Sequence, residues 1–196
     1  HQDLIAALNE TSILLDLQRN ERDRFLLLDD ISTQQSPRVM NVYFARLSQV
    51  YTSSPAIQTA WANYMQRYAL QTKKPKTIYS QALTIVNQAL ELQGDFLPAI
   101  DLKTRIFYQT KQDAQAEAFL RSVLLAYPDS KDVALLLGQL LYDLKKYPLA
   151  EQQYKTLLSQ FSDSHEARFY LGAIYFATNR FDQSLQQYRK LLGKPY

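Results

Sequence analysis

The sequence predicts an all-α chain in which antiparallel helix pairs stack as a right-handed solenoid. Three observations lead to this prediction. Glycine is scarce, with 4 among 196 residues, and 46% of the residues are hydrophobic, which suits a helical chain with a sizeable core. A 34-residue period also links small and apolar positions through the last two thirds of the chain, as in the series Ala82, Ala116, Ala150, Ser184 and Val86, Leu120, Tyr154, Tyr188. Such a period is typical of stacked helical hairpins that cannot each bury an apolar face alone.

The most regular repeat covers residues 131–164. Ser130 precedes it and is the residue type that caps a helix N-terminus. The first helix of this repeat carries an apolar stripe at helical spacing, made of Ala134, Leu137, Gly138 and Leu141. Pro148 then opens the second helix, where the missing N–H of proline costs nothing.

Small residues recur where two helices of one hairpin would cross. Gly138 and Gly172 are 34 residues apart and both fall inside a first helix. Helices in contact approach to roughly 8–10 Å, so a crossing point excludes large side chains. We therefore expect close packing at both glycines, and a loss of roughly 1–3 kcal/mol for leucine at Gly138.

The same register recurs on both sides of this repeat, at 97–130 and at 165–196, where Asp182 is expected to cap the last helix. The repeat at 63–96 is irregular. Its first helix is expected to start after Pro55, and Pro75 should end that helix early.

Residues 1–62 are helical by pattern but out of phase with the repeats. Leu4, Leu8 and Leu15 lie on one stripe, and Pro37 opens a further helix. Two interpretations remain open for this segment: degenerate repeats, or a separate N-terminal helical cap.

The period carries a family resemblance. The residues Leu137-Gly138, Ala150, Tyr154 and, one repeat later, Leu171-Gly172, Tyr175, Tyr188 resemble the tetratricopeptide repeat signature. The resemblance covers residues 63–196, divided into 63–96, 97–130, 131–164 and 165–196. Lys103-Thr104 depart from the signature because they replace its Leu-Gly pair. The resemblance implies a binding protein without enzymatic activity.

No constellation for catalysis, metal or cofactor binding is visible in the sequence. The chain has no cysteine, only two histidines, and four isolated glycines that cannot form a phosphate-binding loop. Asp29 and Asp30 are adjacent and make a poor acid–base pair, so we expect them in a loop or at a helix end. Net charge is only +3, and Lys73, Lys74 and Lys76 form the one tight basic cluster, so we expect no nucleic-acid partner.

The resemblance places the first helices of the repeats on the concave face, which is the expected site for a protein or peptide partner. On this basis the candidate binding residues are Asp101, Arg105, Tyr108, Leu135, Gln139, Tyr142, Phe169 and Phe176. Tyr108, Tyr142 and Phe176 would form an aromatic ladder with one ring per repeat. Arg105 would pair with a carboxylate, and Gln139 with a peptide backbone. The alternative is that these rings pack between neighbouring repeats.

The expected function is a scaffold or adaptor that binds another polypeptide. The final segment, residues 167–190, resembles repeats of bacterial envelope lipoproteins, some of which deliver substrates to a periplasmic carboxyl-terminal processing protease. This favours the periplasm or outer membrane over the cytoplasm, with a lipid anchor outside the given sequence. Assembly lipoproteins of pili or secretion systems, a nucleic-acid-binding helical repeat and a homo-oligomer remain as alternatives. No run of apolar residues is long enough to span a membrane.

Overall fold

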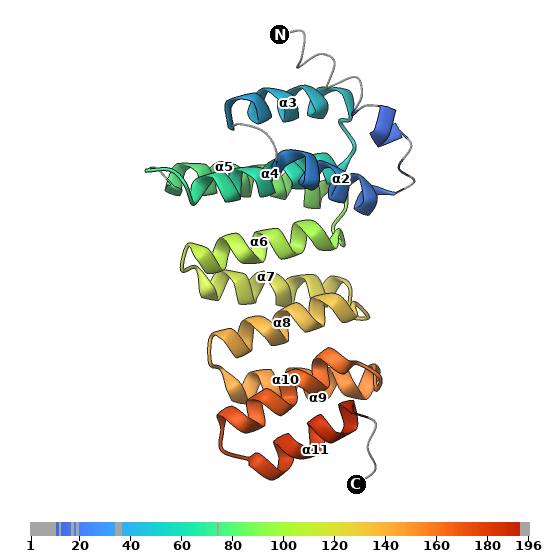
Figure 1. Cartoon of the computed structure of the whole chain (residues 1–196), viewed down its shortest axis with the longest axis vertical. Helices are drawn as coiled ribbons and strands as arrows, with labels where there is room; N and C mark the ends of the chain where they lie inside the picture. Colours follow the sequence, from blue (N-terminus) through green and yellow to red (C-terminus); the bar gives the residue numbers. More distant parts are fainter. Residues whose placement is uncertain are drawn as a thin grey trace. The chain divides into compact units, whose positions relative to one another are not determined.

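The computed structural model describes residues 11, 13–16, 18, 20–33, 37–73 and 75–192, and these residues form helices joined by short turns (Figure 1). His1, Leu4, Leu8 and Lys74 lie outside the described residues. The chain divides into two compact units, His1–Lys111 (unit 1) and Gln112–Tyr196 (unit 2). Unit 1 contains α2 (Glu21–Thr33), α3 (Pro37–Val50), α4 (Pro55–Ala69), α5 (Pro75–Leu92) and α6 (Leu97–Gln109); unit 2 contains α7 (Asp113–Ala126), α8 (Lys131–Asp143), α9 (Tyr147–Gln160), α10 (His165–Ala177) and α11 (Phe181–Leu191).

Proline and serine mark several of the helix starts, as the sequence predicts. Pro55 opens α4, which ends at Ala69, well before Pro75 opens α5. The Ser130 hydroxyl accepts a hydrogen bond from the Val133 amide at the start of α8. One expected cap is wrong: α11 begins at Phe181 with Arg180 as its N-cap, so Asp182 lies inside the first turn. There its carboxylate interacts favourably with the positive end of the helix dipole, although it does not cap the helix.

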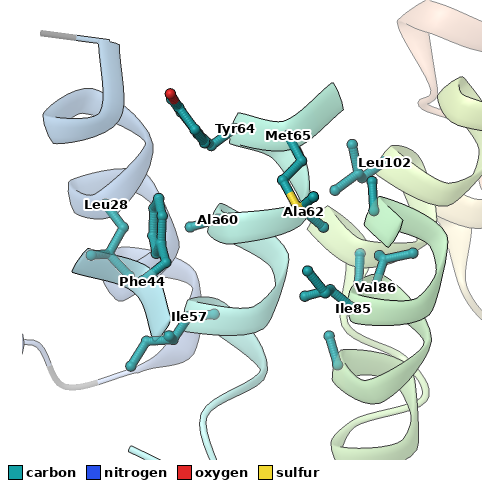
Figure 2. Packing of buried hydrophobic residues seen from close by; sticks show 14 of the residues in the cluster. Leu28, Phe44, Ile57, Ala60, Ala62, Tyr64, Met65, Ile85, Val86 and Leu102 are labelled. Atoms are coloured by element: carbon teal, nitrogen blue, oxygen red, sulfur yellow. The ribbon is translucent and has the colours of Figure 1, made fainter. Parts of the chain in front are cut away.

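Unit 1 is built around α4. This helix packs against α2, α3, α5 and α6, and 12 of its 15 residues are buried. Figure 2 shows Leu28 and Phe44 beside Ala60 on one side of α4, and Ile85 and Val86 of α5 on the other. Alanine at the contact positions allows neighbouring helices to approach α4 closely. The core of unit 1 therefore surrounds a helix instead of lying between two layers.

Unit 2 is a run of antiparallel helices in which tyrosine rings fill the space above the glycines. A Cβ atom added to Gly138 would lie 2.6 Å from two ring atoms of Tyr154, and one added to Gly172 would lie 2.8 Å from the ring of Tyr188. Both distances are shorter than a van der Waals contact. The predicted close packing at these glycines is thus confirmed, and the tyrosine of the following helix is what occupies the space.

Two ionic clips repeat in unit 2 with the 34-residue period. In the first, one carboxylate oxygen of Glu117 accepts from Arg121 at 2.8 Å and the other from Lys146 at 2.7 Å. In the second, Glu151 holds Lys155 and Arg180, both at 2.6 Å. Each glutamate side chain is only 16% exposed. Each clip therefore joins a helix to a residue 29 positions further along, at the start of the second helix after it.

The backbone before each distant cation has a left-handed turn that positions it. Lys145 and Asn179 have φ values of 57° and 59°, and each immediately precedes the clip cation, Lys146 or Arg180. The amide of Lys146 then donates to the Leu141 carbonyl at 2.9 Å, and that of Arg180 donates to the Tyr175 carbonyl at 2.8 Å. This bonding pattern closes the end of the preceding helix. It therefore fixes the direction in which the side chain of Lys146 or Arg180 extends from the backbone.

The clips predict a pH dependence of stability. The hydrogen bond from Lys146 lowers the pKa of Glu117, and the bond from Arg180 lowers the pKa of Glu151, in both cases against the raising effect of burial. A carboxylate whose pKa is depressed on folding contributes stability above its unfolded value of about 4.5, and this contribution is lost as the pH falls through the folded value. The clips should therefore stabilise the chain at pH 7 and not in acid.

We expect Glu117→Gln with Glu151→Gln to lower the free energy of unfolding at pH 7 by about 1–2 kcal/mol, at roughly 0.5–1 kcal/mol per clip. The difference from the wild-type chain should shrink towards zero near pH 3. Urea denaturation at both pH values measures it. Asp163→Asn, in an exposed loop, is the control for removal of a carboxylate. An equal loss at both pH values would contradict the ionic origin of the effect.

Candidate functional site

Five of the predicted binding residues lie on α8 and α10, which are the first helices of the two hairpins in unit 2. Leu135, Gln139 and Tyr142 follow one another along α8 at spacings of four and three residues, and therefore share one face of that helix. Phe169 and Phe176 share one face of α10, which packs against α8. We call these five residues the aromatic face. Gln139 is exposed, whereas Leu135 and Tyr142 are half-buried.

The two phenylalanines of the aromatic face are unusually exposed. Phe169 exposes 52% of its surface and Phe176 exposes 63%. Neighbouring rings support both of them: Phe169 lies 5.6 Å from Tyr170 and 6.0 Å from Tyr188, and Phe176 lies 5.5 Å from Phe181, measured between ring centroids. Each phenylalanine is therefore held by aromatic contacts while one side of its ring faces solvent.

Tyr142 has a different environment. Its ring centroid lies 5.7 Å from that of Tyr147 and 5.6 Å from that of Tyr170, so it packs between its own hairpin and the next one. Tyr170 in turn stacks on Tyr154 at 5.3 Å with parallel ring planes. The structure thus gives Tyr142 a packing role between repeats and leaves part of its surface accessible.

The other three predicted residues, Asp101, Arg105 and Tyr108, lie on α6 in unit 1. The Arg105 guanidinium pairs with Asp101 at 3.0 Å and donates to the Asn63 side-chain oxygen at 3.3 Å. Tyr108 is 38% exposed, with the Lys111 ammonium 5.7 Å from its ring centroid. The charge of Arg105 is therefore already balanced within the unit, so a partner carboxylate would have to compete with Asp101.

A polar network extends from Arg105 across the first helices of unit 1. Asn63 donates to the Asp29 carboxylate at 2.7 Å, and Arg67 pairs with the same carboxylate at 3.1 Å and donates to the Ser32 hydroxyl. Gln66 donates to the Gln109 side-chain oxygen at 2.7 Å. These contacts join α2, α4 and α6 through side chains on one face of unit 1.

The sequence prediction missed Asp29, Asn63 and Arg67 as members of this network. Asp29 lies inside α2, so the expected position in a loop or at a helix end is wrong. A signal was present, because Asp29 and Asn63 are 34 residues apart. Arg67 also lies close in sequence to the basic cluster, but its charge is paired with Asp29, while Lys73 and Lys76 are exposed. Burial lowers the pKa of Lys103, on α6 of the same unit.

Unit 1 also contains a hollow of about 410 Å³ between α3, α4 and α5. It is lined by Asn41, Trp61, Met65, Gln81, Thr84 and Ile85. The Trp61 indole N–H donates to the Asn41 side-chain oxygen at 3.3 Å, which fixes the ring at the wall of the hollow. Within the described part of the chain, no three histidine or acidic side chains converge as a metal site would require, and no helix has the length and hydropathy of a membrane span.

The comparisons with known proteins agree with this architecture. Residues 105–158 and 135–195 match the tetratricopeptide repeat family model. Over residues 105–195 the chain is therefore similar to tetratricopeptide repeats. No curated protein shows significant similarity to the sequence. The fold is shared with solved tetratricopeptide repeat structures, which confirms the predicted all-α, tetratricopeptide-type class.

Three of these structures illustrate the likeness. MamA from Desulfovibrio magneticus RS-1 has 16% identity and a TM-score of 0.59, over 87% of this chain and 94% of MamA. YrrB, described as a tetratricopeptide repeat protein with an unusual peptide-binding site, has 13% identity and a TM-score of 0.55, over 87% and 82%. A tetratricopeptide repeat protein from Parabacteroides merdae ATCC 43184 has 14% identity and a TM-score of 0.61, over 98% and 67%. At these identities the likeness shows the fold alone.

Proposed function

We propose that the protein is a non-enzymatic scaffold whose aromatic face binds a segment of a partner polypeptide that presents large apolar side chains. The observation that carries the proposal is the exposure of Phe169 and Phe176, each held in place by neighbouring rings. Phenylalanine side chains left more than half exposed on one helix face form the kind of apolar surface that marks interaction sites. Aromatic side chains also combine large contact area with few rotatable bonds.

The chemistry of the face favours a polypeptide over a small apolar ligand. Gln139 is exposed on the face of α8 that also carries Tyr142, and its amide both donates and accepts, which matches the backbone groups of a peptide. Phe169 and Phe176 are two helical turns apart, which separates their anchor points by about 10 Å. A partner segment with two large apolar side chains at a similar spacing would contact both rings. Repeat folds of this kind, such as that of YrrB with its peptide-binding site, support the class of function.

We also propose that this scaffold acts in the bacterial envelope, as an adaptor that brings substrates to a processing protease. The support is the resemblance of residues 167–190 to repeats of envelope lipoproteins. In this setting a lipid anchor outside the given sequence would hold the repeats at the membrane. The absence of cysteine from the chain agrees with folding in an oxidising compartment without disulfide bonds.

The test compares the wild-type chain with Phe169→Ala/Phe176→Ala in capture of proteins from a periplasmic extract, followed by titration calorimetry with the purified partner. We expect the double variant to weaken binding by about 100-fold or more, since hot-spot aromatics each contribute 2 kcal/mol or more. Leu125→Ala is the matched control, because Leu125 is 87% exposed on α7 and outside the aromatic face. Circular dichroism should show the same helix content in all variants.

Two outcomes would overturn the proposal in different ways. Equal affinity of the wild-type chain and the double variant would exclude the aromatic face. Capture of a defined partner from a cytoplasmic extract alone would exclude the envelope setting and leave the scaffold function intact.

A further inference from the structure

A second exposed apolar surface lies on α11. Phe181, Leu185 and Leu192 are 55%, 48% and 69% exposed, and Tyr188 is half-buried. Their spacing of four, three and four residues places them within an arc of about 60° on the helix surface. The side of α11 that packs on α10 carries Ser184 and Gln187, both buried, and the ring of Tyr188, at the edge of this side, lies against Gly172 of α10. We call the four apolar residues the α11 stripe.

The α11 stripe interrupts the periodic chemistry of unit 2. Leu185 lies two periods after Glu117 and one period after Glu151, and Arg189 stands in the same relation to Arg121 and Lys155. In α7 and α9 this position holds the glutamate of an ionic clip, whereas in α11 it holds a leucine. The basic residue four positions later is present in all three helices. Arg189 therefore has no acidic residue at the position that serves Arg121 and Lys155 in the other two helices.

The stripe is symmetric about its own midpoint. Leu185 and Tyr188 are equally far from the midpoint, and so are Phe181 and Leu192. In an antiparallel copy of the helix, Phe181 would oppose Leu192 and Leu185 would oppose Tyr188. A two-fold axis has this requirement, because residue i of one protomer must contact residue j of its partner and the reverse.

The charges beside the stripe are centred close to the same point, because the midpoint of Asp182 and Arg189 lies one residue before that of the stripe. Asp182 and Arg189 are seven residues apart, so they lie on the same flank of α11 at its opposite ends, and both are exposed. In the antiparallel arrangement each Asp182 would lie beside Arg189 of the other copy, within about one helical turn. In a parallel two-fold pair this flank would lie on opposite sides of the contact in the two copies, so Asp182 and Arg189 would not meet. The charge pattern therefore selects a second copy in the antiparallel orientation.

We propose that the α11 stripe binds the α11 stripe of a second copy of this chain, antiparallel and about a two-fold axis. The two Asp182–Arg189 pairs fix the orientation, and the helix dipoles oppose each other favourably. A contact centred on a helix of 11 residues is small. It is therefore expected to be weak, with a dissociation constant on the order of 10–100 µM.

The first experiment is sedimentation equilibrium of the whole chain from about 5 to 500 µM, a range that covers the expected affinity. The wild-type chain should move from monomer to dimer, and Leu185→Lys should raise the dissociation constant at least about tenfold, because it buries a charge at the centre of the contact. Leu125→Lys, the same change at an exposed site on α7, should dimerise like the wild-type chain. A chain that stays monomeric, or a dimer that Leu185→Lys does not weaken, would overturn the proposal.

The second experiment tests the orientation by charge exchange. Asp182→Arg and Arg189→Asp should each weaken dimerisation, since each places like charges beside one another twice in a symmetric dimer. The double variant restores opposite charges at both places and should dimerise nearly as well as the wild-type chain. If the double variant dimerised as poorly as the sum of the two single effects predicts, the antiparallel arrangement would be contradicted.

Leu185→Lys separates this inference from the proposed function. The Phe169→Ala/Phe176→Ala variant cannot do so, because Phe169 contacts Tyr188 and Phe176 contacts Phe181, and both of these partners belong to the α11 stripe. Leu185→Lys changes no residue of the aromatic face, so it should weaken dimerisation and keep its affinity for the captured partner.

Discussion

Replacing Tyr154 with alanine is expected to lower the free energy of unfolding by about 3–5 kcal/mol, the range for truncation of a buried aromatic side chain. Tyr154 is fully buried on α9. Its ring lies against Gly138 and stacks on Tyr170 at 5.3 Å, so it fills the space between two hairpins. Burial raises the pKa of the Tyr154 phenol, which is therefore neutral at pH 7. Its contribution to stability comes from packing.

Tyr154→Phe is the matched control because it keeps the ring. The Tyr154 hydroxyl is buried and has no hydrogen-bond partner. Removing an unsatisfied hydroxyl should cost nothing, or stabilise the chain by about 1 kcal/mol. Urea denaturation followed by circular dichroism measures both variants. If phenylalanine were as damaging as alanine, the packing explanation would be wrong and an undetected polar contact would have to be sought.

The second large effect is expected for Gly138→Leu, which should lower the free energy of unfolding by about 3 kcal/mol, at the upper end of overpacking costs. Even the Cβ atom of the new side chain would lie 2.6 Å from the Tyr154 ring. The ring cannot move away easily because Tyr170 stacks on it. Gln139→Leu, one residue further on the exposed side of the same helix, should leave stability almost unchanged.

A double-mutant cycle identifies the ring as the source of the clash. In the Tyr154→Ala background the space above Gly138 is open, so Gly138→Leu should cost much less than it does in the wild-type chain. The two losses should then fall short of additivity by at least about 1 kcal/mol, which is within the usual range for residues in contact. Additive losses would mean that leucine clashes with something other than Tyr154.

The regular part of unit 2 could be predicted from sequence because each of its contacts repeats at one spacing. Gly138 and Tyr154 are followed by Gly172 and Tyr188 at the same separation, and the structure places each pair in contact. The ionic clips follow the same period, with Glu117 and Glu151, so they could have been found by the same comparison. They were missed because charged residues on a helix are normally taken as its solvated face.

The contacts of unit 1 could not be predicted from the period, because the residues that meet are not separated by one constant number of positions. Asp29 and Asn63 are 34 residues apart, whereas Asn63 and Arg105 are 42 apart and Gln66 and Gln109 are 43 apart. The longer α5, with 18 residues against 14 in α7, contributes to this difference. A fixed 34-residue register therefore aligns α4 wrongly with α6, and the polar network is visible only in three dimensions.

The sequence indicates which positions of the repeats are equivalent in the candidate site. It does not indicate which of the side chains at these positions are exposed. The period identifies Tyr142 and Phe176 as equivalent, one repeat apart. Yet Tyr142 has ring contacts with both Tyr147 and Tyr170, whereas Phe176 has one with Phe181 and remains 63% exposed. Whether a ring is covered depends on which neighbours follow it in space, and a single sequence pattern does not encode that.

The ionic clips join residues that are close in sequence, and this has a consequence for how unit 2 unfolds. Each clip joins residues only 29 positions apart, and the ring contacts described for unit 2 are similarly local. Local contacts form quickly, and a linear array of them can open from one end. The α10–α11 hairpin should therefore exchange its amide protons before α8 and α9 do, as a separate step that precedes global unfolding.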